Sequence, residues 1–432
     1  MRRILLVLVL LFLGGCTLAG LYRHCFRAAV PEDIAGWRAA ARGVPHAASV
    51  DVVSDDGELD PVVRYRLISV NWEICPRVAR VVTPASVGAD YLISSAYLRD
   101  GQRRLLSEAG YVPQQSNTFA WVWGRRGADP AAVAAVPVRA AQCPFGGLRP
   151  PNGLGVYAGK AKLFIRNRGV PEGFWTDPTY AIYQPSYPPG MTVLAVLAFA
   201  MTGVADSGLV GCLVPAALLG IFLLLTARAR DPLAYALALL YVLCPWALRM
   251  GAGFYAEPLA ALCLIAGARL LRTGHARLGW WVVGCAALFR HEALLLAGLM
   301  WCGDDTHSRG SGYAALLPGV AWQMFAWSVG ARVYDYDFTS CPNGAHLWEA
   351  LKATLHLLTA GAGAIGGGLL PLALGKGWRG LRVCLEPLVF LGACVFLLGF
   401  NTSGHFSWIV DGTMPRVAWL SMSVALGRAL HF

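Results

Sequence analysis

The sequence predicts a mostly α-helical fold, a polytopic transmembrane helical bundle of about ten spans with a small exported α/β module inserted after the first helix. Hydrophobic residues make up 56% of the 432-residue chain and charged residues only 14%, whereas soluble chains carry about a quarter charged residues. Apolar runs of helical length occur at the start of the chain and again after residue 190. A more polar stretch separates them, and this stretch predicts the inserted module.

The charge distribution bears on the class of partner. The formal net charge of +11 comes mainly from arginines, and these lie mostly at the ends of apolar runs. Arginine in that position is typical of loops at lipid headgroups rather than of a nucleic-acid surface. We therefore expect membrane lipid as a partner and no nucleic acid. The 12 cysteines include no CxxC pair and indicate no metal or disulfide framework.

Residues 1–21 are expected to form the first transmembrane helix or a signal anchor. Two arginines precede an apolar run over residues 4–21, about 18 residues and just enough for a span. The stretch Leu13–Cys16 also has the pattern of a bacterial lipobox, at which the chain would be cut before Cys16. We prefer an uncleaved helix because the rest of the chain is itself predicted to be membrane-embedded.

Residues 22–147 are predicted to form an exported α/β module and its linker. Short β-branched and aromatic runs indicate strands, and an amphipathic helix at 98–109 ends at Gly110. The expected strands cover 49–54, 77–83, 89–94 and 118–123. This order suggests a small Rossmann-like unit, but the absence of GxGxxG gives no support for nucleotide binding.

Residues 148–190 are expected to be interfacial helices of the first exported loop, and residues 191–432 the transmembrane bundle. The bundle prediction rests on apolar runs, several of them interrupted by Gly or Pro as membrane helices tolerate. The runs cover roughly 191–205, 208–226, 233–250, 254–271, 279–301, 313–331, 353–374, 383–400 and 413–430.

Five short motifs, taken in order, carry the functional signal. They are Tyr157-x-x-Lys160-Ala161-Lys162, Gln184–Pro189, Gly253–Pro258, Phe289–Ala293 and Asp411–Arg416. Together they resemble the GT-C glycosyltransferases, the bacterial protein mannosyltransferase and aminoarabinose transferase group. In those enzymes a "W-x-x-K-A-(K/R)" helix and a "H-P-D-Y-P-P" turn end the first exported loop, and "G-Y-A-D/E-x-P", "K/R-N-E-G" and "T-S-x-x-R" segments follow. The resemblance covers residues 148–300 moderately well and the rest in outline.

The resemblance implies an inverting transfer of a sugar from a polyprenyl-phosphate donor to a cell-envelope glycan, lipid or protein. It also implies a multi-pass protein of the bacterial inner membrane, with residues 22–190 on the extracytoplasmic side. Such a reaction needs a carboxylate base for the acceptor and cations or a divalent metal for the leaving phosphate. The cofactor expectation is accordingly none certain, with a divalent metal ion as the candidate.

The position of the base departs from the family pattern. The family places an Asp about eight positions before the Lys-Ala pair, and Asn152 stands there in this chain. The acidic pair Glu32–Asp33 is the first substitute for the catalytic residue, and Asp177 is the second. An acidic residue in a solvated loop remains the simpler interpretation of all three.

The substrate-binding candidates are charged or aromatic residues in or beside the other motifs. They are Lys160, Tyr187, Tyr255, Glu257, Arg290, His291, Glu292 and Arg416. Ionisable residues inside predicted spans are costly and normally face a polar cavity, which favours a site. The structural alternative is an ion pair that holds helices together, for instance Arg290 with Glu257 or Glu292.

Two other functions remain open. A non-catalytic membrane scaffold derived from the same family would explain Asn152. A transporter or flippase would predict internal repeats, and the sequence shows none.

Overall fold

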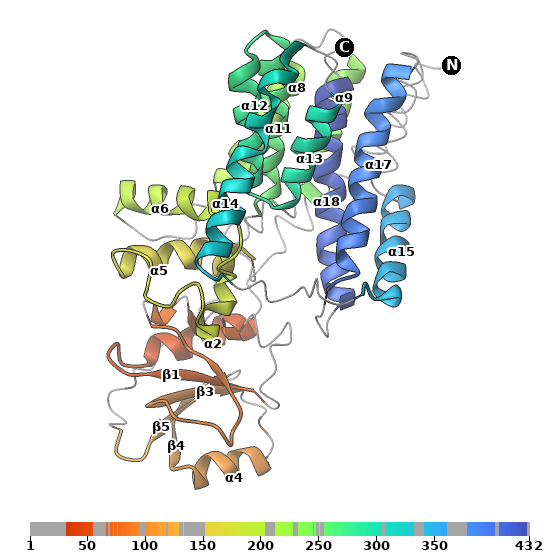
Figure 1. Ribbon diagram of the computed structural model, residues 1–432. Helices are drawn as coiled ribbons and strands as arrows, with labels where there is room; N and C mark the ends of the chain where they lie inside the picture. Colours follow the sequence, from red (N-terminus) through yellow and green to blue (C-terminus); the bar gives the residue numbers. More distant parts are fainter. Residues whose placement is uncertain are drawn as a thin grey trace. The chain divides into compact units, whose positions relative to one another are not determined.

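The computed structural model (Figure 1) describes residues 32–54, 66–128, 133, 152–203, 212–227, 232–250, 255–303, 307–331, 341–360, 378–401 and 406–429, with gaps of one or two residues inside 66–128 and 232–250. The side chains at some helix ends also lie outside this description, those of Glu32 and Asp33 among them. The chain divides into two compact units. We call them the α/β unit, whose described residues are 32–185 and 192–203, and the helical unit, with 186–191 and the described residues from 212 onward.

The α/β unit contains a five-stranded sheet in the order β2-β1-β3-β5-β4. β1 (Val50–Val53) pairs in parallel with both β2 (Val81–Val82) and β3 (Tyr91–Ser95). β5 (Ala120–Arg125) runs antiparallel to β3 and to β4 (Tyr111–Ser116). The strands expected at 49–54, 77–83, 89–94 and 118–123 are thus confirmed, and α4 (Asp100–Glu108) confirms the expected helix.

Strand β4 was not expected from the sequence. It contains Pro113 and successive glutamines, which are poor signals for a strand. Its position at the edge of the sheet tolerates the proline, because that backbone nitrogen needs no ladder partner there. The register shifts between Pro113 and Gln115, so Gln114 is a bulge residue. A Cβ on the facing Gly124 would lie 2.9 Å from the Gln114 side chain, which explains the glycine.

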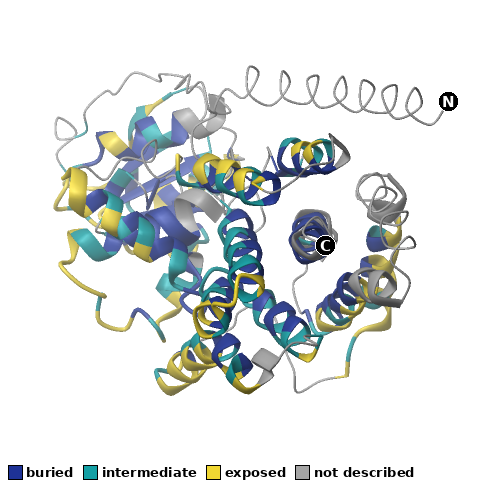
Figure 2. Cartoon of the chain, turned by 90° about the horizontal axis from the view of Figure 1, so that it is seen from above, coloured by how far each residue is buried: buried dark blue, intermediate teal, exposed yellow. Residues whose placement is uncertain are grey.

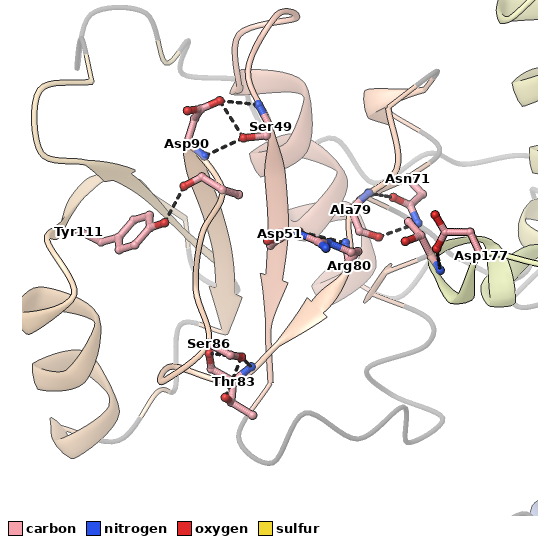
Figure 3. A network of polar contacts seen from close by, with 12 residues as sticks. Ser49, Asp51, Asn71, Ala79, Arg80, Thr83, Ser86, Asp90, Tyr111 and Asp177 are labelled. Carbon is pink, nitrogen blue, oxygen red and sulfur yellow. Dashed lines mark hydrogen bonds and ion pairs between the residues drawn. The ribbon is translucent and has the colours of Figure 1, made fainter. Parts of the chain in front are cut away.

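Polar contacts fix the starts of the central strands (Figure 3). The Ser49 backbone N–H and hydroxyl both donate to one Asp90 carboxylate oxygen, at 2.8 and 2.7 Å. These bonds hold the pKa of Asp90 below its usual value. The Tyr111 hydroxyl donates to the Ala89 carbonyl at 2.6 Å. The chain is therefore pinned on both sides of β3, so its register is set by side chains as well as by the ladder.

Helices complete the α/β unit. α2 (Glu32–Gly43) packs on β3 and β5 and buries Trp37. A π-helical turn, η2 (Asn152–Gly159), leads directly into α5 (Lys160–Arg166), and the 3-10 helix η3 (Pro178–Tyr183) packs on η2. α6 (Gly190–Thr202) begins in the helical unit and continues into the α/β unit.

The helical unit is a set of packed helices around a shared apolar core (Figures 1 and 2). α11 packs on α8, α12 and α18, and α17 packs on α13, α15 and α18. The described part of α18 is almost entirely buried. The helices are α8 (Leu213–Thr226), α9 (Pro232–Leu243), α11 (Glu257–Arg272), α12 (Ala276–Cys285), α13 (Glu292–Cys302), α14 (Leu317–Ser328), α15 (Gly344–Ala360), α17 (Trp378–Leu398) and α18 (Phe406–Ala429), with the 3-10 turns η4 (Ala286–Leu288) and η5 (His307–Ala315).

Glycines set the close crossing of α11 and α12. A Cβ on Gly267 would lie 2.8 Å from the Gly279 carbonyl oxygen, and one on Gly279 would lie 2.8 Å from the Leu271 nitrogen. Both positions therefore lack room for a side chain. This crossing joins the two helices whose ends lead into the candidate site.

The predicted polytopic transmembrane bundle of about ten spans is wrong for the part of the chain that the structure describes. None of the helices there combines the length and the apolarity that crossing a membrane requires. The apolar run at 279–301, for example, is split at Arg290 into α12, η4 and α13. α12 has 10 residues, about 15 Å of helix against a hydrocarbon core of about 30 Å. The longer α17 and α18 carry charged residues and internal prolines.

The same finding overturns the predicted location as a multi-pass protein of the bacterial inner membrane with residues 22–190 outside. Hydropathy averaged over a window does not register a helix break, so it counted interrupted segments as continuous spans. The first predicted span, residues 1–21, lies outside the described residues.

Candidate functional site

The candidate site is an ionic cluster at helix ends of the helical unit. Glu257 is the first residue of α11, and Glu292 is the first residue of α13. Arg290 lies in the break between η4 and α13, and Arg416 lies inside α18 next to Pro415. Residues more than 150 positions apart in the sequence therefore meet in one place.

Local sequence explains why these side chains lie at helix starts. Pro258 occupies the first turn of α11, where a proline needs no hydrogen-bond partner and favours helix initiation. The chain segment carrying Tyr187 approaches closely at Gly190, where a Cβ would lie 2.6 Å from the Leu288 carbonyl oxygen. The glycine that follows the Pro-Pro pair is thus the residue that lets this turn reach the chain just before Arg290.

Glu257 is the centre of the cluster. Its carboxylate oxygen Oε1 accepts a hydrogen bond from Nη1 of Arg416 at 2.9 Å and lies 3.4 Å from Nε of Arg290. Arg290 also donates from Nη2 to Oε1 of Glu292 at 2.6 Å. Arg416 makes a further contact, from Nη2 to the Thr413 hydroxyl at 3.2 Å. The two arginines and two carboxylates form one connected network with balanced formal charge.

Each guanidinium group also contacts an aromatic ring. The Arg416 guanidinium carbon lies 4.7 Å from the centre of the Tyr255 ring, and that of Arg290 lies 5.8 Å from the Tyr187 ring. The Tyr187 ring in turn meets the His291 ring edge-on, with centroids 5.5 Å apart. Stacking of this kind restricts the planes of the guanidinium groups and so orients their remaining N–H donors.

Exposure rises from the centre of the cluster outward. Glu257 is 0% exposed and Arg290 3%, whereas the Glu292 side chain is 22% exposed. His291 is half-buried, and its Nδ1 lies 2.6 Å from Nε2 of the exposed Gln323. A polar path therefore leads from the buried Glu257 to the protein surface.

The carboxylates retain acceptor capacity. The second oxygen of Glu257 and that of Glu292 are buried without a hydrogen-bond partner among the described residues. Burial raises the pKa of Glu292, but the charges of Arg290 and His291 more than offset this, so the net pKa lies below its ordinary value. Glu292 is therefore a carboxylate at neutral pH, able to accept a hydrogen bond from a hydroxyl group.

Seven of the expected substrate-binding residues come together in this cluster. They are Tyr187, Tyr255, Glu257, Arg290, His291, Glu292 and Arg416. The expected structural alternative, an ion pair of Arg290 with both Glu257 and Glu292, is also present. Sequence reasoning missed Gln323 and Trp322, whose indole N–H donates to the Ser186 carbonyl at 3.2 Å and holds the Tyr187 segment. A polar residue within the otherwise apolar α14 was the only available signal for Gln323.

Lys160, the eighth expected residue, lies in the α/β unit. Its Nζ donates to the Gln184 carbonyl at 3.1 Å and lies 5.9 Å from the Phe174 ring centre. Burial lowers the pKa of this ammonium group to about 7. Gln184 has a left-handed backbone (φ 44°), so the Gln184–Pro189 motif bends sharply where the lysine binds it. Lys160 thus ties two of the sequence motifs together.

The expected catalytic residues are placed only in part. Glu32 and Asp33 belong to the first turn of α2, and their side chains lie outside the described residues, as does that of Asn152. Asp177 caps η3: its carboxylate accepts the Thr179 backbone N–H at 2.8 Å, and this bond lowers its pKa. The cap gives Asp177 a structural role and weakens it as a base.

A divalent metal ion was the cofactor candidate. Within the described ranges, no group of three or more His, Cys, Asp and Glu side chains is arranged to hold a metal. Any charge compensation for a leaving phosphate would therefore come from the arginines, as far as the described residues go.

Comparison with known proteins adds no relative. No family model, curated protein or solved structure matches the chain.

Proposed function

We propose that this protein is a glycosyltransferase that moves a sugar from a polyprenyl-phosphate donor to a cell-envelope acceptor, with the ionic cluster as its donor-phosphate site. The observation that carries the proposal is convergence. The Gln184–Pro189, Gly253–Pro258, Phe289–Ala293 and Asp411–Arg416 motifs were singled out by their order along the chain. Described residues of all four meet around Glu257.

The arginines are the groups that suit a phosphate. Guanidinium groups bind phosphate oxygens in a two-pronged fashion, and Arg290 and Arg416 are both buried and held by carboxylates and aromatic rings. Cations that are already oriented stabilise developing negative charge at little reorganisation cost. In the proposed reaction they would bind the phosphate that leaves the sugar.

The transfer step is a substitution at the sugar's anomeric carbon. An acceptor oxygen attacks that carbon, the bond to the phosphate oxygen breaks, and polyprenyl phosphate leaves with the bonding electrons. A carboxylate must take the acceptor's proton. We assign that role to the Glu32–Asp33 pair, and we assign the unpartnered oxygen of Glu292 to a sugar hydroxyl.

Transfer of label from radioactive polyprenyl-phosphate sugars, supplied in detergent to the purified chain, tests the proposal. Wild type should transfer sugar from at least one donor in a panel. Arg290→Gln and Arg416→Gln should each lower the rate at least tenfold, because a buried charge-assisted contact to phosphate is lost. Glu32→Gln/Asp33→Asn should abolish transfer while leaving donor binding intact.

The matched control is Arg104→Gln, which removes an arginine paired with Glu108 on an exposed helix surface. It should transfer sugar at the wild-type rate. Arg416→Lys keeps the charge but loses the planar fork, so it separates phosphate recognition from simple charge balance. Folding of each variant is checked by circular dichroism. Absence of transfer by well-folded wild type with every donor would reject the enzyme and favour the scaffold.

A further inference from the structure

The α/β unit carries a second cluster of charges, separate from the site above. On α2, Arg38 and Arg42 are four residues apart and therefore on one side of the helix. Both approach Glu73: the Nε of Arg38 lies 2.5 Å from Oε1, and the Nε of Arg42 lies 3.8 Å from Oε2. Glu73 is the only carboxylate among the residues that this cluster comprises.

Two more cations reach the same place from α5. Lys162 and Arg166 are again four residues apart on one helix. Burial lowers the pKa of Lys162; Cys75 and Glu73 raise it, whereas Arg166 and Arg38 lower it further, so these groups lie within electrostatic reach of one another. Burial likewise raises the pKa of Cys75 to about 11, so its thiol is neutral at physiological pH and adds no negative charge.

The charge of this cluster is not balanced. Arg38, Arg42, Lys162 and Arg166 surround the single carboxylate of Glu73, which leaves a formal excess of three positive charges. The side chains are accessible: that of Arg42 is 43% exposed, and Arg166 is exposed at the end of α5. Like charges gathered on a folded surface repel one another, and a bound anion relieves that repulsion.

We propose that this cluster, defined as Arg38, Arg42, Glu73, Lys162 and Arg166, is a binding site for a phosphate monoester or diphosphate group. Three arginine forks and one ammonium group offer many N–H donors to phosphate oxygens, and a phosphate carrying up to two negative charges matches the excess positive charge. The group could be that of a soluble phosphate or of a phospholipid headgroup, and both present the same chemistry to these side chains.

Binding of two probes to the full-length chain tests the site. Pyrophosphate in solution is titrated by calorimetry, and vesicles with or without phosphatidic acid in phosphatidylcholine are tested by co-sedimentation. Lys162→Gln/Arg166→Gln should weaken the binding of at least one probe at least tenfold. Arg103→Gln/Arg104→Gln on α4 removes the same charge from the same unit and should change binding less than twofold.

A third variant gives an effect of opposite sign. Glu73→Gln removes the carboxylate that competes with the ligand, so binding should tighten severalfold. A purely structural ion pair would give no such gain. Binding of pyrophosphate identifies a soluble phosphate as the source of the ligand, and binding of phosphatidic-acid vesicles alone identifies a headgroup. Saturable binding of neither probe, or equal losses in both double variants, would overturn the proposal.

Discussion

The two charge clusters use the same residue types under opposite conditions. The ionic cluster of the helical unit is buried around Glu257, and its two arginines are matched by two carboxylates. The cluster of the α/β unit is partly exposed, and its four cations share Glu73. Burial makes every uncompensated charge costly, so balance is required in the first cluster. Water and salt tolerate the excess charge of the second.

This comparison separates what an arginine contributes to stability from what it offers to a ligand. In the helical unit each guanidinium group is held by carboxylates, rings and neighbouring side chains, so its geometry is fixed before any ligand arrives. In the α/β unit the arginines remain adjustable at the surface. Substitutions should therefore cost stability mainly in the helical unit and change salt-dependent binding mainly in the α/β unit.

The largest effect is expected for Glu257→Gln. Two buried arginines would lose their common carboxylate, and removal of one partner from a buried ion pair costs about 3–5 kcal/mol. Urea denaturation followed by tryptophan fluorescence measures the change. The control is Glu349→Gln, which breaks an exposed pair with Lys352 in the same unit and should cost less than about 1 kcal/mol. Equal losses would remove the distinction between buried and exposed clusters.

Lys160→Met sharpens the comparison with a buried cation whose only described polar contact is a carbonyl. The folded-state pKa of about 7 lies below the ordinary 10.5, so the charged form is disfavoured by folding. The variant should be more stable than wild type by about 3 kcal/mol below pH 7, after allowance for the lost hydrogen bond.

The pH dependence gives this second prediction its sign. Between about pH 7 and 10.5 the unfolded chain binds the proton and the folded chain does not, so wild-type stability rises with pH. The advantage of Lys160→Met should shrink over that window. Paired urea titrations of both proteins at several pH values measure it, and an advantage that does not change with pH would show that Lys160 is uncharged or solvated when folded.

Gly190→Ala tests the approach of the Tyr187 segment to the ionic cluster. The new methyl group would lie 2.6 Å from the Leu288 carbonyl oxygen, and such overpacking costs about 1–3 kcal/mol. Gly392→Ala in α17 meets no atom within 4 Å and should be neutral or stabilising, since alanine favours a helix. Thermal unfolding of both variants decides, and a neutral Gly190→Ala would mean that the segment can move away from the cluster.

The smallest effect is expected for Arg38→Gln. Its pair with Glu73 is partly exposed, so the stability loss should be about 1 kcal/mol or less and should fall further as salt is raised. Denaturation at low and high ionic strength measures both. A large, salt-independent loss would place Arg38 with the buried arginines and break the comparison.

Local patterns predicted the α/β unit well. Alternating apolar residues and turn signals located β1, β2, β3 and β5, because these strands bury one face against the unit's core. β4 escaped because Pro113 and Gln114 carry no strand signal, and only the pairing partner β5 makes that segment a strand. Pairing between segments is a property of the fold rather than of a window of sequence.

The candidate site was predictable as residues but not as geometry. Charged residues within apolar runs marked Glu257, Arg290 and Arg416, and the sequence offered an Arg290–Glu257 pair as one alternative. It did not show that Arg416 shares the same oxygen of Glu257, because that contact depends on how α11 and α18 pack. The span count failed for a related reason, since a charged break such as the one at Arg290 ends a helix without changing average hydropathy much.

The edges of the sheet have a consequence for how this protein behaves at high concentration. β2, at one edge, is two residues long, and β4, at the other, carries Pro113 and a bulge. Neither presents a long, flat row of free backbone groups to which a strand from another molecule could add. The α/β unit should therefore resist edge-to-edge polymerisation and fibril growth, so crowded copies of the chain can meet without their sheets joining.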